Sequence, residues 1–326
     1  MDLKQLVEEQ IRAQGWIRPG DTVLCGVSGG ADSLCLFHLL SAYKGEHSFA
    51  VMHVHHHLRD SADGDEAFVR ELCKRCAVTY YRADVYLEPG ASEEAARKAR
   101  YAAFRDKLRE LQPDPAHRKL AVAHTMDDDA ETVLFRLFRG SGLKGLGGIR
   151  ALQPMEDYTI FRPLLSVSRL QIEEYLNEKG FRWCSDETNA GDSYARNRIR
   201  HHILRTAAES VNPRAAEHIH GAAEQLKLAE DYLEDQAEAC FASCTEDLPD
   251  GVHIDRKAFL ALHPYMQRRL ALTAMQKVSG REGDFSADHV LLFCGLFSLP
   301  TGKMLDLPGG LHATRSRTAV ELLRKS

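Results

Sequence analysis

The sequence predicts an α/β protein, in which a parallel-sheet domain is followed by a smaller, mainly helical C-terminal domain. Between residues 20 and 140, short β-rich runs alternate with helical patterns, and repeating β–α units favour a parallel sheet covered by helices. A glycine turn, Ser28-Gly29-Gly30, joins the first strand directly to a helix. Beyond residue 214 the apolar periodicity is mainly helical.

The individual elements follow from apolar spacing and turn residues. Apolar and β-branched runs predict strands at residues 22–27, 49–55, 78–84 and 120–123. Helical spacing predicts helices at 31–43, 62–76 and 92–111, and another after Asp127. Glycine and proline interrupt residues 140–166, and Ser168 then caps a helix at 168–178. Helices at 214–241, 256–278 and 287–297 and a strand with a turn at 304–310 complete the chain.

Composition and length set the outer bounds. The 326 residues are enough for two domains, which we expect at 1–212 and 213–326, divided near Asn212-Pro213. No apolar run approaches the roughly 20 residues that span a bilayer, and the N-terminus lacks the apolar core of a signal peptide, so we expect a cytoplasmic protein. The net charge of −5 gives no overall attraction to nucleic acid, so RNA binding would rely on a local basic patch.

The eight cysteines are expected to stay reduced in that compartment. Cys73 and Cys76 form a Cys-x-x-Cys pair within a helical pattern, and we expect both on one buried face rather than on a metal. The sequence does not fix the oligomeric state, and a homodimer is compatible with it.

Residues 22–33, Thr-Val-Leu-Cys-Gly-Val-Ser-Gly-Gly-Ala-Asp-Ser, form the most informative segment. A strand, a glycine turn and a helix start place free backbone N–H groups at a positive helix end, which is an anion site. Ser28 and Ser33 add hydroxyl groups, and Asp32 adds a carboxylate for a metal ion or an amine. The lysine of a Walker A motif is absent.

A second polar segment, His124-Thr125-Met126-Asp127-Asp128-Asp129-Ala130-Glu131, follows the strand at 120–123. Asp128 and Glu131 are three residues apart, so their carboxylates share a helix face. Clustered carboxylates bind Mg²⁺ together with phosphates or accept a proton from an amine. A charged helix start is the alternative, since acids are also favoured there by the helix dipole.

Three further segments carry candidate residues. His53 to Arg59 ends the second strand, where a nucleotide's base or ribose would lie; neighbouring strand residues point to opposite faces, so these histidines chelate a metal poorly. Arg97 and Arg100 share a helical face suited to phosphate, although a solvated face fits equally. Five glycines between Arg139 and Ile149 predict a mobile loop, either a lid or a substrate-binding loop.

An arginine-rich segment follows Trp183-Cys184-Ser185-Asp186. Four arginines, at 196, 198, 200 and 205, and two histidines lie close together after Tyr194. Arginines beside aromatic residues suit RNA, whereas a plain surface helix is the alternative for this segment alone.

Together these segments resemble the tRNA(Ile) lysidine synthases, a family of PP-loop ATP pyrophosphatases. The matches come in family order over about residues 20–205: the loop at 28–33, residues 53–59, 96–101 and 124–132, Arg139-Gly140-Ser141-Gly142, Arg162-Pro163-Leu164-Leu165, Trp183-x-x-Asp186 and Arg196-Asn197-x-Ile199-Arg200. Residues 301–311 match a family segment more weakly.

The resemblance implies a PP-loop catalytic domain, of the adenine nucleotide α-hydrolase-like kind, at 1–212 and a tRNA-binding domain at 213–326. It implies ATP and Mg²⁺ as cofactors, and as partners free L-lysine and tRNA(Ile) with a CAU anticodon. ATP would adenylate the C2 oxygen of the wobble cytidine and release pyrophosphate. The ε-amine of lysine would then attack C2 and displace AMP, which leaves lysidine.

The resemblance also assigns roles to residues. Those implied in catalysis are Asp32, Asp128, Glu131 and Arg97. Those implied in nucleotide binding are Ser28, Gly29, Gly30, Ala31, Asp32, Ser33, His53, His55 and His124. Those implied in binding tRNA or lysine are Asp127, Arg100, Arg139, Gly142, Arg162, Arg196, Asn197 and Arg200. Asp32 and Asp127 are the expected metal ligands, and within the acid cluster we assign Asp128 and Glu131 to lysine.

Three departures and two alternatives accompany this hypothesis, and the first departure is Thr125, where many relatives carry another residue. Asp129 stands where a glutamine is usual, which we expect to make the site more acidic, and longer family members have an additional C-terminal domain without a counterpart in this sequence. A PP-loop enzyme that thiolates tRNA is the first alternative; it would need catalytic thiols. A protein that binds RNA or nucleotide without turnover is the second, and it would not need the carboxylates.

Overall fold

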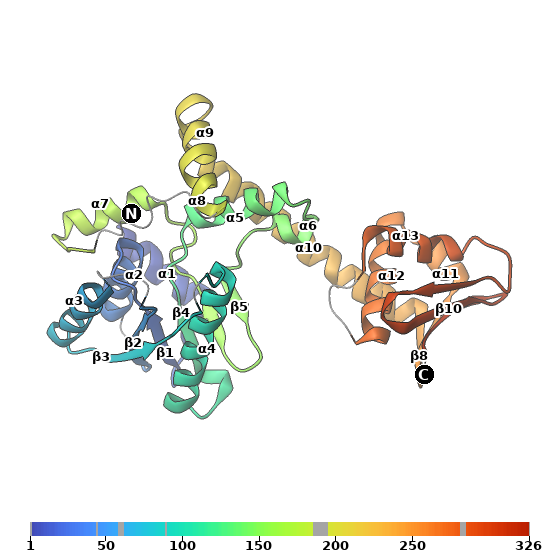
Figure 1. The fold of residues 1–326 in the computed structure, drawn as a ribbon, viewed down its shortest axis with the longest axis horizontal. Helices are drawn as coiled ribbons and strands as arrows, with labels where there is room; N and C mark the ends of the chain where they lie inside the picture. Colours follow the sequence, from blue (N-terminus) through green and yellow to red (C-terminus); the bar gives the residue numbers. More distant parts are fainter. Residues whose placement is uncertain are drawn as a thin grey trace. The chain divides into compact units, whose positions relative to one another are not determined.

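The structure, a computed structural model, describes residues 2–43, 45–57, 62–88, 90–184, 195–280 and 285–325. Contacts divide the chain into two units, Met1–Lys227 and Leu228–Ser326, and the division falls within the long helix α10 (Ala215–Cys244). Both units are drawn in Figure 1.

The N-terminal unit is built on a six-stranded sheet. The strands are β1 (Thr22–Gly26), β2 (Ser48–His55), β3 (Thr79–Asp84), β4 (Arg118–Ala121), β5 (Leu152–Pro154) and β6 (Thr159–Phe161). Their order is β3-β2-β1-β4-β6-β5; the first five in this order are parallel, and β5 is antiparallel to β6. The parallel sheet expected from the β–α alternation is therefore confirmed.

The helices of this unit come before, between and after the strands. They are α1 (Leu3–Ala13), α2 (Ala31–Ala42), α3 (Ala62–Arg75), α4 (Glu93–Leu111), η1 (Pro115–His117), α5 (Met126–Phe138), α6 (Leu143–Leu146), α7 (Arg169–Glu178), α8 (Ala195–Arg198), the π-helix η3 (Ile199–Leu204), α9 (Arg205–Ser210) and the first part of α10.

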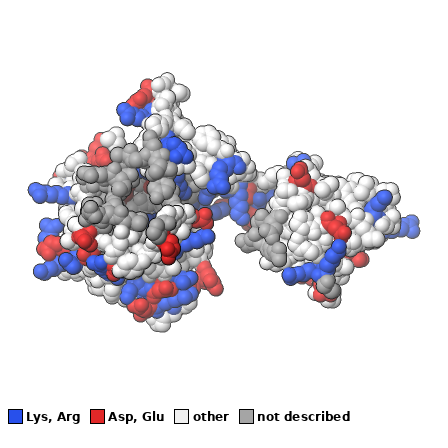
Figure 2. Space-filling view, viewed as in Figure 1, with Lys and Arg blue, Asp and Glu red and all other residues white. Residues whose placement is uncertain are grey.

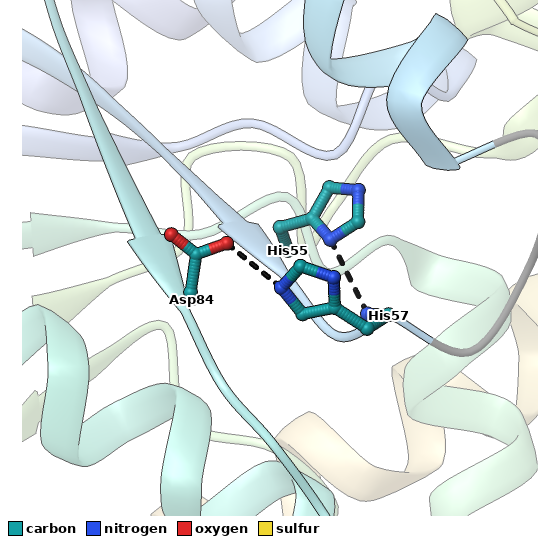
Figure 3. A group of neighbouring side chains, drawn as sticks. All are labelled: His55, His57 and Asp84. Atoms are coloured by element: carbon teal, nitrogen blue, oxygen red, sulfur yellow. Dashed lines mark hydrogen bonds and ion pairs between the residues drawn. The ribbon is translucent and has the colours of Figure 1, made fainter.

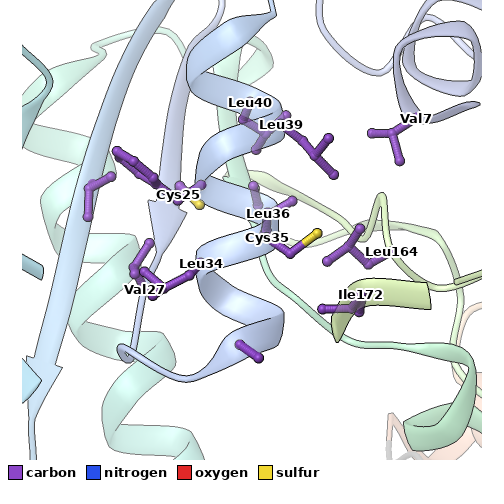
Figure 4. Close-up of a cluster of buried hydrophobic side chains, with 14 of the residues drawn as sticks. Val7, Cys25, Val27, Leu34, Cys35, Leu36, Leu39, Leu40, Leu164 and Ile172 are labelled. Atoms are coloured by element: carbon purple, nitrogen blue, oxygen red, sulfur yellow. The ribbon is translucent and has the colours of Figure 1, made fainter. Parts of the chain in front are cut away.

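Alternation along the strands assigns the helices to the two faces of the sheet. Val23 and Cys25 of β1 belong to the core that α1, α2, α3 and α7 cover, whereas Leu24 packs with Phe104 of α4 on the opposite face. Figure 4 shows the first core, with apolar side chains of α2 lying between Cys25 and Ile172. Burial on both faces explains why β1 is apolar without a polar side.

The strand order reverses direction at β1. The chain runs from β1 outward to β2 and β3, and then returns to place β4 on the other side of β1. Ligands of such sheets bind at the carboxyl ends of the strands beside the reversal. Those ends lead into the loop at residues 28–30 and into His124 and α5, so the topology brings the two main polar segments of the sequence to one edge.

The C-terminal unit combines helices with a five-stranded antiparallel sheet. Its elements are β7 (Thr245–Leu248), β8 (Gly251–Asp255), α11 (Arg256–Ala261), α12 (Pro264–Ser279), α13 (Ala287–Leu296), β9 (Met304–Leu307), η4 (Pro308–Gly310), β10 (Leu311–Arg315) and β11 (Ala319–Arg324). The strand order is β7-β8-β11-β10-β9. The sequence indicated one strand here; the others are only four to six residues long, which is too short for a clear period.

Two local expectations were wrong. The helix expected at 256–278 is broken at His263, because the residue before a proline avoids the helical region, and α12 begins anew at Pro264 with His263 as its cap. Cys76 lies beyond the end of α3 and is exposed, so it does not share the buried face of Cys73. Within the described ranges, every helix is too short or too polar to cross a membrane.

Candidate functional site

The loop after β1 is held in shape by one side chain, Ser33. Its hydroxyl oxygen accepts the backbone N–H groups of Ser28, at 3.2 Å, and Gly29, at 3.3 Å, and the hydroxyl donates to the Gly30 carbonyl at 2.9 Å. Ser28 Oγ lies 3.2 Å from Ser33 Oγ. The loop therefore curls around the first turn of α2, and Ser33 organises it.

Glycine occupies the two loop positions for different structural reasons. Gly29 has φ +103°, a conformation that residues with a side chain rarely adopt, and its carbonyl accepts the backbone N–H of Cys184 at 2.9 Å. Gly30 has an ordinary φ of −72° and forms the N-cap of α2. A Cβ at Gly30 would meet only Ser28 Oγ, at 3.7 Å, so this position stays open for a ligand to approach the backbone.

Asp32, in the first turn of α2, has one occupied and one unoccupied carboxylate oxygen. Oδ2 accepts a hydrogen bond of 2.7 Å from Arg169 Nη1 of α7, whereas Oδ1 is buried without a partner among the described residues. Burial, together with the nearby Asp128, raises the pKa of Asp32 to about 6 even though Arg169 opposes the shift. A buried acceptor without a donor favours a cation at this position.

The acids of α5 separate into different environments. Thr125 is the N-cap, and its backbone N–H donates to Asp128 Oδ2 at 2.9 Å in a capping box. Asp127 Oδ2 accepts the Arg169 backbone N–H at 2.8 Å and so ties the start of α7 to α5. Part of the acidity of this helix start is therefore structural, as the alternative interpretation of the sequence holds.

Asp128 and Glu131 remain as a pair and share one guanidinium. Arg200 donates from Nη2 to Asp128 Oδ1 at 3.1 Å and from Nε to Glu131 Oε1 at 2.5 Å. Glu131 is almost fully buried, and burial raises its pKa to about 7 against the opposing charge of Arg200. The predicted sharing of a helix face is confirmed, and the partner of the pair is a residue that the sequence assigned to tRNA.

A π-helix places Arg200 beside the acids of α5. Ile199 and Leu204, five residues apart, are both buried against Ala130 of α5. A π-helix has i→i+5 hydrogen bonds, which bring residues of this spacing to one face. The five-residue spacing of these apolar side chains thus fits the π-helix η3. Because Ile199 packs against α5, its neighbour Arg200 lies close to the acids of that helix.

Asp129 lies outside this acid cluster. It is fully buried, accepts the Ile149 N–H at 2.5 Å through Oδ1, and is bonded through Oδ2 to His220 Nδ1 of α10 at 2.7 Å. The expectation that Asp129 makes the site more acidic is wrong, because one position along a helix turns the side chain by about 100°.

The glycine-rich segment before Ile149 is hydrogen-bonded to side chains of α5 and α10. Arg136 donates from Nη1 to the carbonyls of Gly145 and Gly148 at 3.0 and 2.8 Å, and Lys227 bonds the Ile149 carbonyl. Gly142 caps the short helix α6 within the segment. Arg139 ends α5, with its guanidinium 5.2 Å from the Phe135 ring. These contacts describe how the segment packs, and its mobility stays a prediction.

Arginines gather around His124, which follows β4. Arg162, fully buried after β6, donates from Nε to His124 Nδ1 at 3.0 Å. Arg97 and Arg100 of α4 lie 4.9 and 5.9 Å from the Tyr101 ring centre. Burial lowers the pKa of His124 well below its usual value, and Arg162, Arg97, Arg100 and Arg196 lower it further. This edge of the site suits an anion.

The histidines at the end of β2 divide between the loop and a surface cluster. His53 Nδ1 lies 2.9 Å from the carbonyl of Val27, which leads into the loop. Burial lowers the pKa of His53, so its ring is neutral. His53 and His55 are both almost completely buried. His53 is thus the strand-end histidine that contacts the chain beside the loop.

Figure 3 shows the cluster of His55, His57 and Asp84. His55 Nδ1 accepts the His57 backbone N–H at 3.3 Å, and His57 Nε2 lies 2.8 Å from Asp84 Oδ1. The same Asp84 oxygen accepts two hydrogen bonds from Arg82. These contacts place a guanidinium on the Asp84 carboxylate and pair His57 with the same oxygen, which favours a structural role. Arg59, at the end of the expected segment, lies outside the described residues.

Arg196 and Asn197 stand in α8, directly before Arg200. Ser185, Asp186 and Tyr194 lie outside the described residues. Figure 2 shows acidic and basic side chains interspersed on the visible face of the N-terminal unit, so an anion would be selected by local groups of arginines rather than by net charge.

One central residue, Arg169, was missed by sequence reasoning. It pairs with Asp32, 137 positions away, and with Glu173 at 2.7 Å. A signal was present, because a cation directly after the N-cap Ser168 is disfavoured by the helix dipole and therefore needs an acidic partner.

Comparisons with known proteins agree with this geometry. The family model of the PP-loop domain matches residues 2–207. A tRNA(Ile)-lysidine synthase from Solibacter usitatus is 38% identical over 311 residues, which cover 94% of this chain and 69% of that protein. Another from Caldanaerobacter subterraneus is 33% identical over 324 residues, with 97% and 68% covered.

Among solved structures, the chain is similar to a U34-tRNA thiolase, NcsA from Methanococcus maripaludis with its 4Fe-4S cluster. The match covers 69% of this chain and 77% of the thiolase chain. The TM-score is 0.54 at 18% identity, so this likeness concerns the fold alone.

Proposed function

The chain belongs to the PP-loop family and, within it, to the tRNA(Ile)-lysidine synthases. We propose that it uses ATP to join free L-lysine to C2 of the wobble cytidine of tRNA(Ile) with a CAU anticodon. The reaction has two steps. The C2 oxygen of the cytidine attacks the α-phosphate of ATP and pyrophosphate leaves; the ε-amine of lysine then forms a bond to C2, AMP leaves and the amine loses a proton.

The observation that carries this proposal is the cluster of three carboxylates beside the loop. Asp32, Asp128 and Glu131 come from two helices that begin at neighbouring strand ends, and two arginines compensate only part of their charge. A site for phosphates alone does not call for buried carboxylates. A site that binds phosphate and a cationic amino acid together does.

The loop suits pyrophosphate. Ser33 Oγ accepts the N–H groups of Ser28 and Gly29 and so fixes the backbone at the start of α2, and the open position at Gly30 leaves room for a phosphate oxygen beside the loop. Charge develops on the leaving pyrophosphate, so fixed donors there stabilise the transition state more than the substrate.

The acids suit the second step. A lysine amine with a reference pKa near 10.4 is charged at pH 7, and deprotonating it there costs about 4.6 kcal/mol. Burial gives Glu131 a pKa of about 7, which is close to the ideal for a group that accepts a proton at neutral pH. We assign Asp128 and Glu131 to lysine, and Arg200 holds the pair before lysine arrives.

Mg²⁺ fits the remaining acceptors. Asp32 Oδ1 is a buried oxygen without a partner in the described chain, and oxygen is the ligand that Mg²⁺ prefers. Asp32 and Asp127 would hold the ion, which would offset phosphate charge when bound.

The other assignments extend outward from this centre. His53 and His55 would lie along the base or ribose of ATP, and the arginines around His124 would meet phosphate. Gly142, Arg139 and Asn197 would line the approach of the tRNA, and we keep tRNA binding by the C-terminal domain expected at 213–326 as a separate prediction. We place the reaction in the cytoplasm, and we retain a homodimer as a prediction that sedimentation of the purified chain tests.

Incorporation of radiolabelled lysine into bulk tRNA is the direct test. We expect label in tRNA only when ATP is present, one pyrophosphate released per lysine attached, and no label in tRNA(Ile) transcripts whose wobble cytidine is replaced by uridine. Ser33→Ala is the matched negative variant. Pyrophosphate release without lysine attachment would limit the chain to adenylation, and no release at all would contradict the proposal.

Thiolation of tRNA remains the alternative to distinguish, because the fold alone is shared with a thiolase. The thiols do not favour it. Burial raises the pKa of Cys73 to about 11 and of Cys184 to about 12, so neither is a ready thiolate. If sulfide rather than lysine stimulates ATP consumption in the presence of tRNA, the alternative is correct.

A further inference from the structure

His124 and Arg162 form a pair whose hydrogen bond has only one possible direction. Arg162 Nε lies 3.0 Å from His124 Nδ1. A guanidinium has donors and no acceptor, so Arg162 must donate and Nδ1 must carry a lone pair. The direction of the bond follows from chemistry alone.

The charges around His124 keep it neutral. Arg162, Arg97, Arg100 and Arg196 all act on this ring, and with burial they move its pKa well below the usual value. The charged groups that act most strongly on this ring are all arginines. A neutral imidazole whose Nδ1 carries a lone pair has its proton on Nε2, which makes Nε2 a donor throughout the neutral pH range.

Arg162 is fixed strongly enough to impose this tautomer. Besides His124, it donates from Nη1 to the Arg150 carbonyl at 2.7 Å and from Nη2 to Gln153 Oε1 at 2.9 Å. It is 1% exposed. Its guanidinium therefore cannot turn away without breaking two other bonds inside the sheet edge.

The Nε2 proton has no acceptor in the described part of the chain, where His124 hydrogen-bonds only through Nδ1. His124 is half-buried and stands at the carboxyl end of β4, beside the reversal of strand order. A donor surrounded by arginines is suited to an oxygen anion, and a phosphate oxygen is the anion that this edge of the sheet attracts.

We propose that Arg162 is a positioning residue that locks His124 in the Nε2-protonated form, and that this neutral N–H donates to a phosphate oxygen of a bound substrate. A neutral donor holds the oxygen without giving up a proton, unlike an imidazolium, which would protonate a leaving group. The proposal rests on the proposed function only for the source of the phosphate, which is either ATP or the tRNA backbone.

The tautomer can be measured without any reaction. In the full chain with ¹⁵N-labelled histidine, the signals of residue 124 are those that disappear in His124→Gln. We expect an unprotonated Nδ1 and a protonated Nε2, unchanged between pH 8 and pH 6. A protonated Nδ1, or titration near the ordinary pKa of histidine, would overturn the proposal.

Arg162→Lys tests the positioning role, because it keeps the charge and loses the directed Nε–H. We expect a mixture of the two tautomers in this variant if it folds. A single Nε2-protonated form in a folded Arg162→Lys chain would contradict the role of Arg162. Should the variant not fold, the signals of the unaltered chain still decide the tautomer.

Two ligand arms identify the phosphate. One adds a non-hydrolysable ATP analogue with Mg²⁺, and the other adds unmodified tRNA(Ile). A downfield shift of the His124 Nε2–H proton in either arm supports donation to phosphate and names its source. No shift in either arm refutes the donor role, even in a chain that makes lysidine normally.

Activity provides an independent readout. His124→Leu should lower kcat/KM for pyrophosphate release by on the order of 10- to 100-fold, the cost of losing a hydrogen bond to a charged oxygen. His124→Gln, which retains an N–H donor, should recover part of the loss. His117→Gln is the matched control, because His117 pairs with Asp21 at the amino edge of the sheet. Equal losses in the leucine and glutamine variants would count against hydrogen-bond donation.

Discussion

Arg200 donates its Nε–H to Glu131 Oε1 at 2.5 Å, across 69 positions of sequence. The contact neutralises a carboxylate that is almost fully buried and that the lysine-transfer step would need. A substrate ammonium carries the same charge as the guanidinium of Arg200. Arg200 and lysine are therefore alternative partners of one acidic site, and Glu131 is the residue through which the two steps of the reaction are best separated.

Glu131→Gln retains an oxygen that Arg200 can reach and removes the negative charge. We expect pyrophosphate release to continue while transfer to lysine slows on the order of 100-fold, the typical contribution of a proton acceptor. Adenylated tRNA should then accumulate, which gel separation of radiolabelled tRNA measures. Glu178→Gln, at the exposed end of α7, is the control.

The opposite result has a clear meaning. If Glu131→Gln stops pyrophosphate release altogether, Glu131 belongs to adenylation and its assignment to lysine is wrong. Asp128 would then be the remaining candidate from α5.

The pKa of Glu131 predicts a pH dependence of stability with a definite sign. Burial raises the pKa to about 7 from an unfolded value near 4.5, so the folded chain holds a proton that the unfolded chain has released between these values. Stability from this group therefore falls as pH rises from about 4.5 to 7. As pH rises over that interval, the thermal unfolding midpoint of the unaltered chain should fall relative to that of Glu131→Gln. A difference in midpoint that stays constant with pH would show that Glu131 does not titrate there.

Catalysis should depend on pH in the opposite direction. Glu131 accepts a proton only when it is ionised, so lysine transfer should fall as pH decreases through about 7. Single-turnover transfer from preformed adenylated tRNA isolates this step. In Glu131→Gln the remaining activity should lack this acidic limb, and a profile that keeps the limb would assign it to another group.

The loop makes a prediction that distinguishes its two glycines. Gly29→Ala forces a side chain into φ +103° and should lower stability by about 1–3 kcal/mol, whereas Gly30→Ala, at an ordinary φ, should leave the unfolding midpoint nearly unchanged. Ser33→Ala removes the acceptor of two loop amides and should abolish pyrophosphate release in a folded chain. Normal release by Ser33→Ala would disprove the role of Ser33 as organiser of an anion site.

The main elements of the N-terminal unit were accessible from sequence because the central strand is buried and two of the helices begin at clear caps. Val23 to Cys25 are apolar on both faces, and Thr125 and Ser168 head capping boxes. The C-terminal sheet was not accessible, because its short strands are fixed by pairing with distant segments rather than by their own pattern.

The side-chain contacts of the site could likewise be predicted only in part from the sequence. Helical spacing was sufficient to pair Asp128 with Glu131, but it did not reveal that Asp129 points away to His220 or that Arg169 reaches Asp32. Such contacts depend on where distant helices pack. Arg200 illustrates the point: the composition of its segment suggested RNA, whereas the π-helix of Ile199 to Leu204 turns it onto α5.

Arg196 and Arg200 therefore make contrasting predictions for tRNA binding. Arg200 is held by two carboxylates, so Arg200→Ala should change the salt dependence of tRNA affinity little, while leaving Glu131 without its cation and lowering activity. Arg196 belongs to the arginine group around His124, and we expect Arg196→Ala to weaken binding and to reduce the slope of log affinity against log salt by about one, the loss of one phosphate contact. Filter binding at several salt concentrations measures both slopes, and ATP binding serves as the control that neither variant should lose. If Arg200→Ala lowers the slope as much as Arg196→Ala, Arg200 leaves the acids when tRNA binds, and the ion pair with Glu131 belongs only to the free protein.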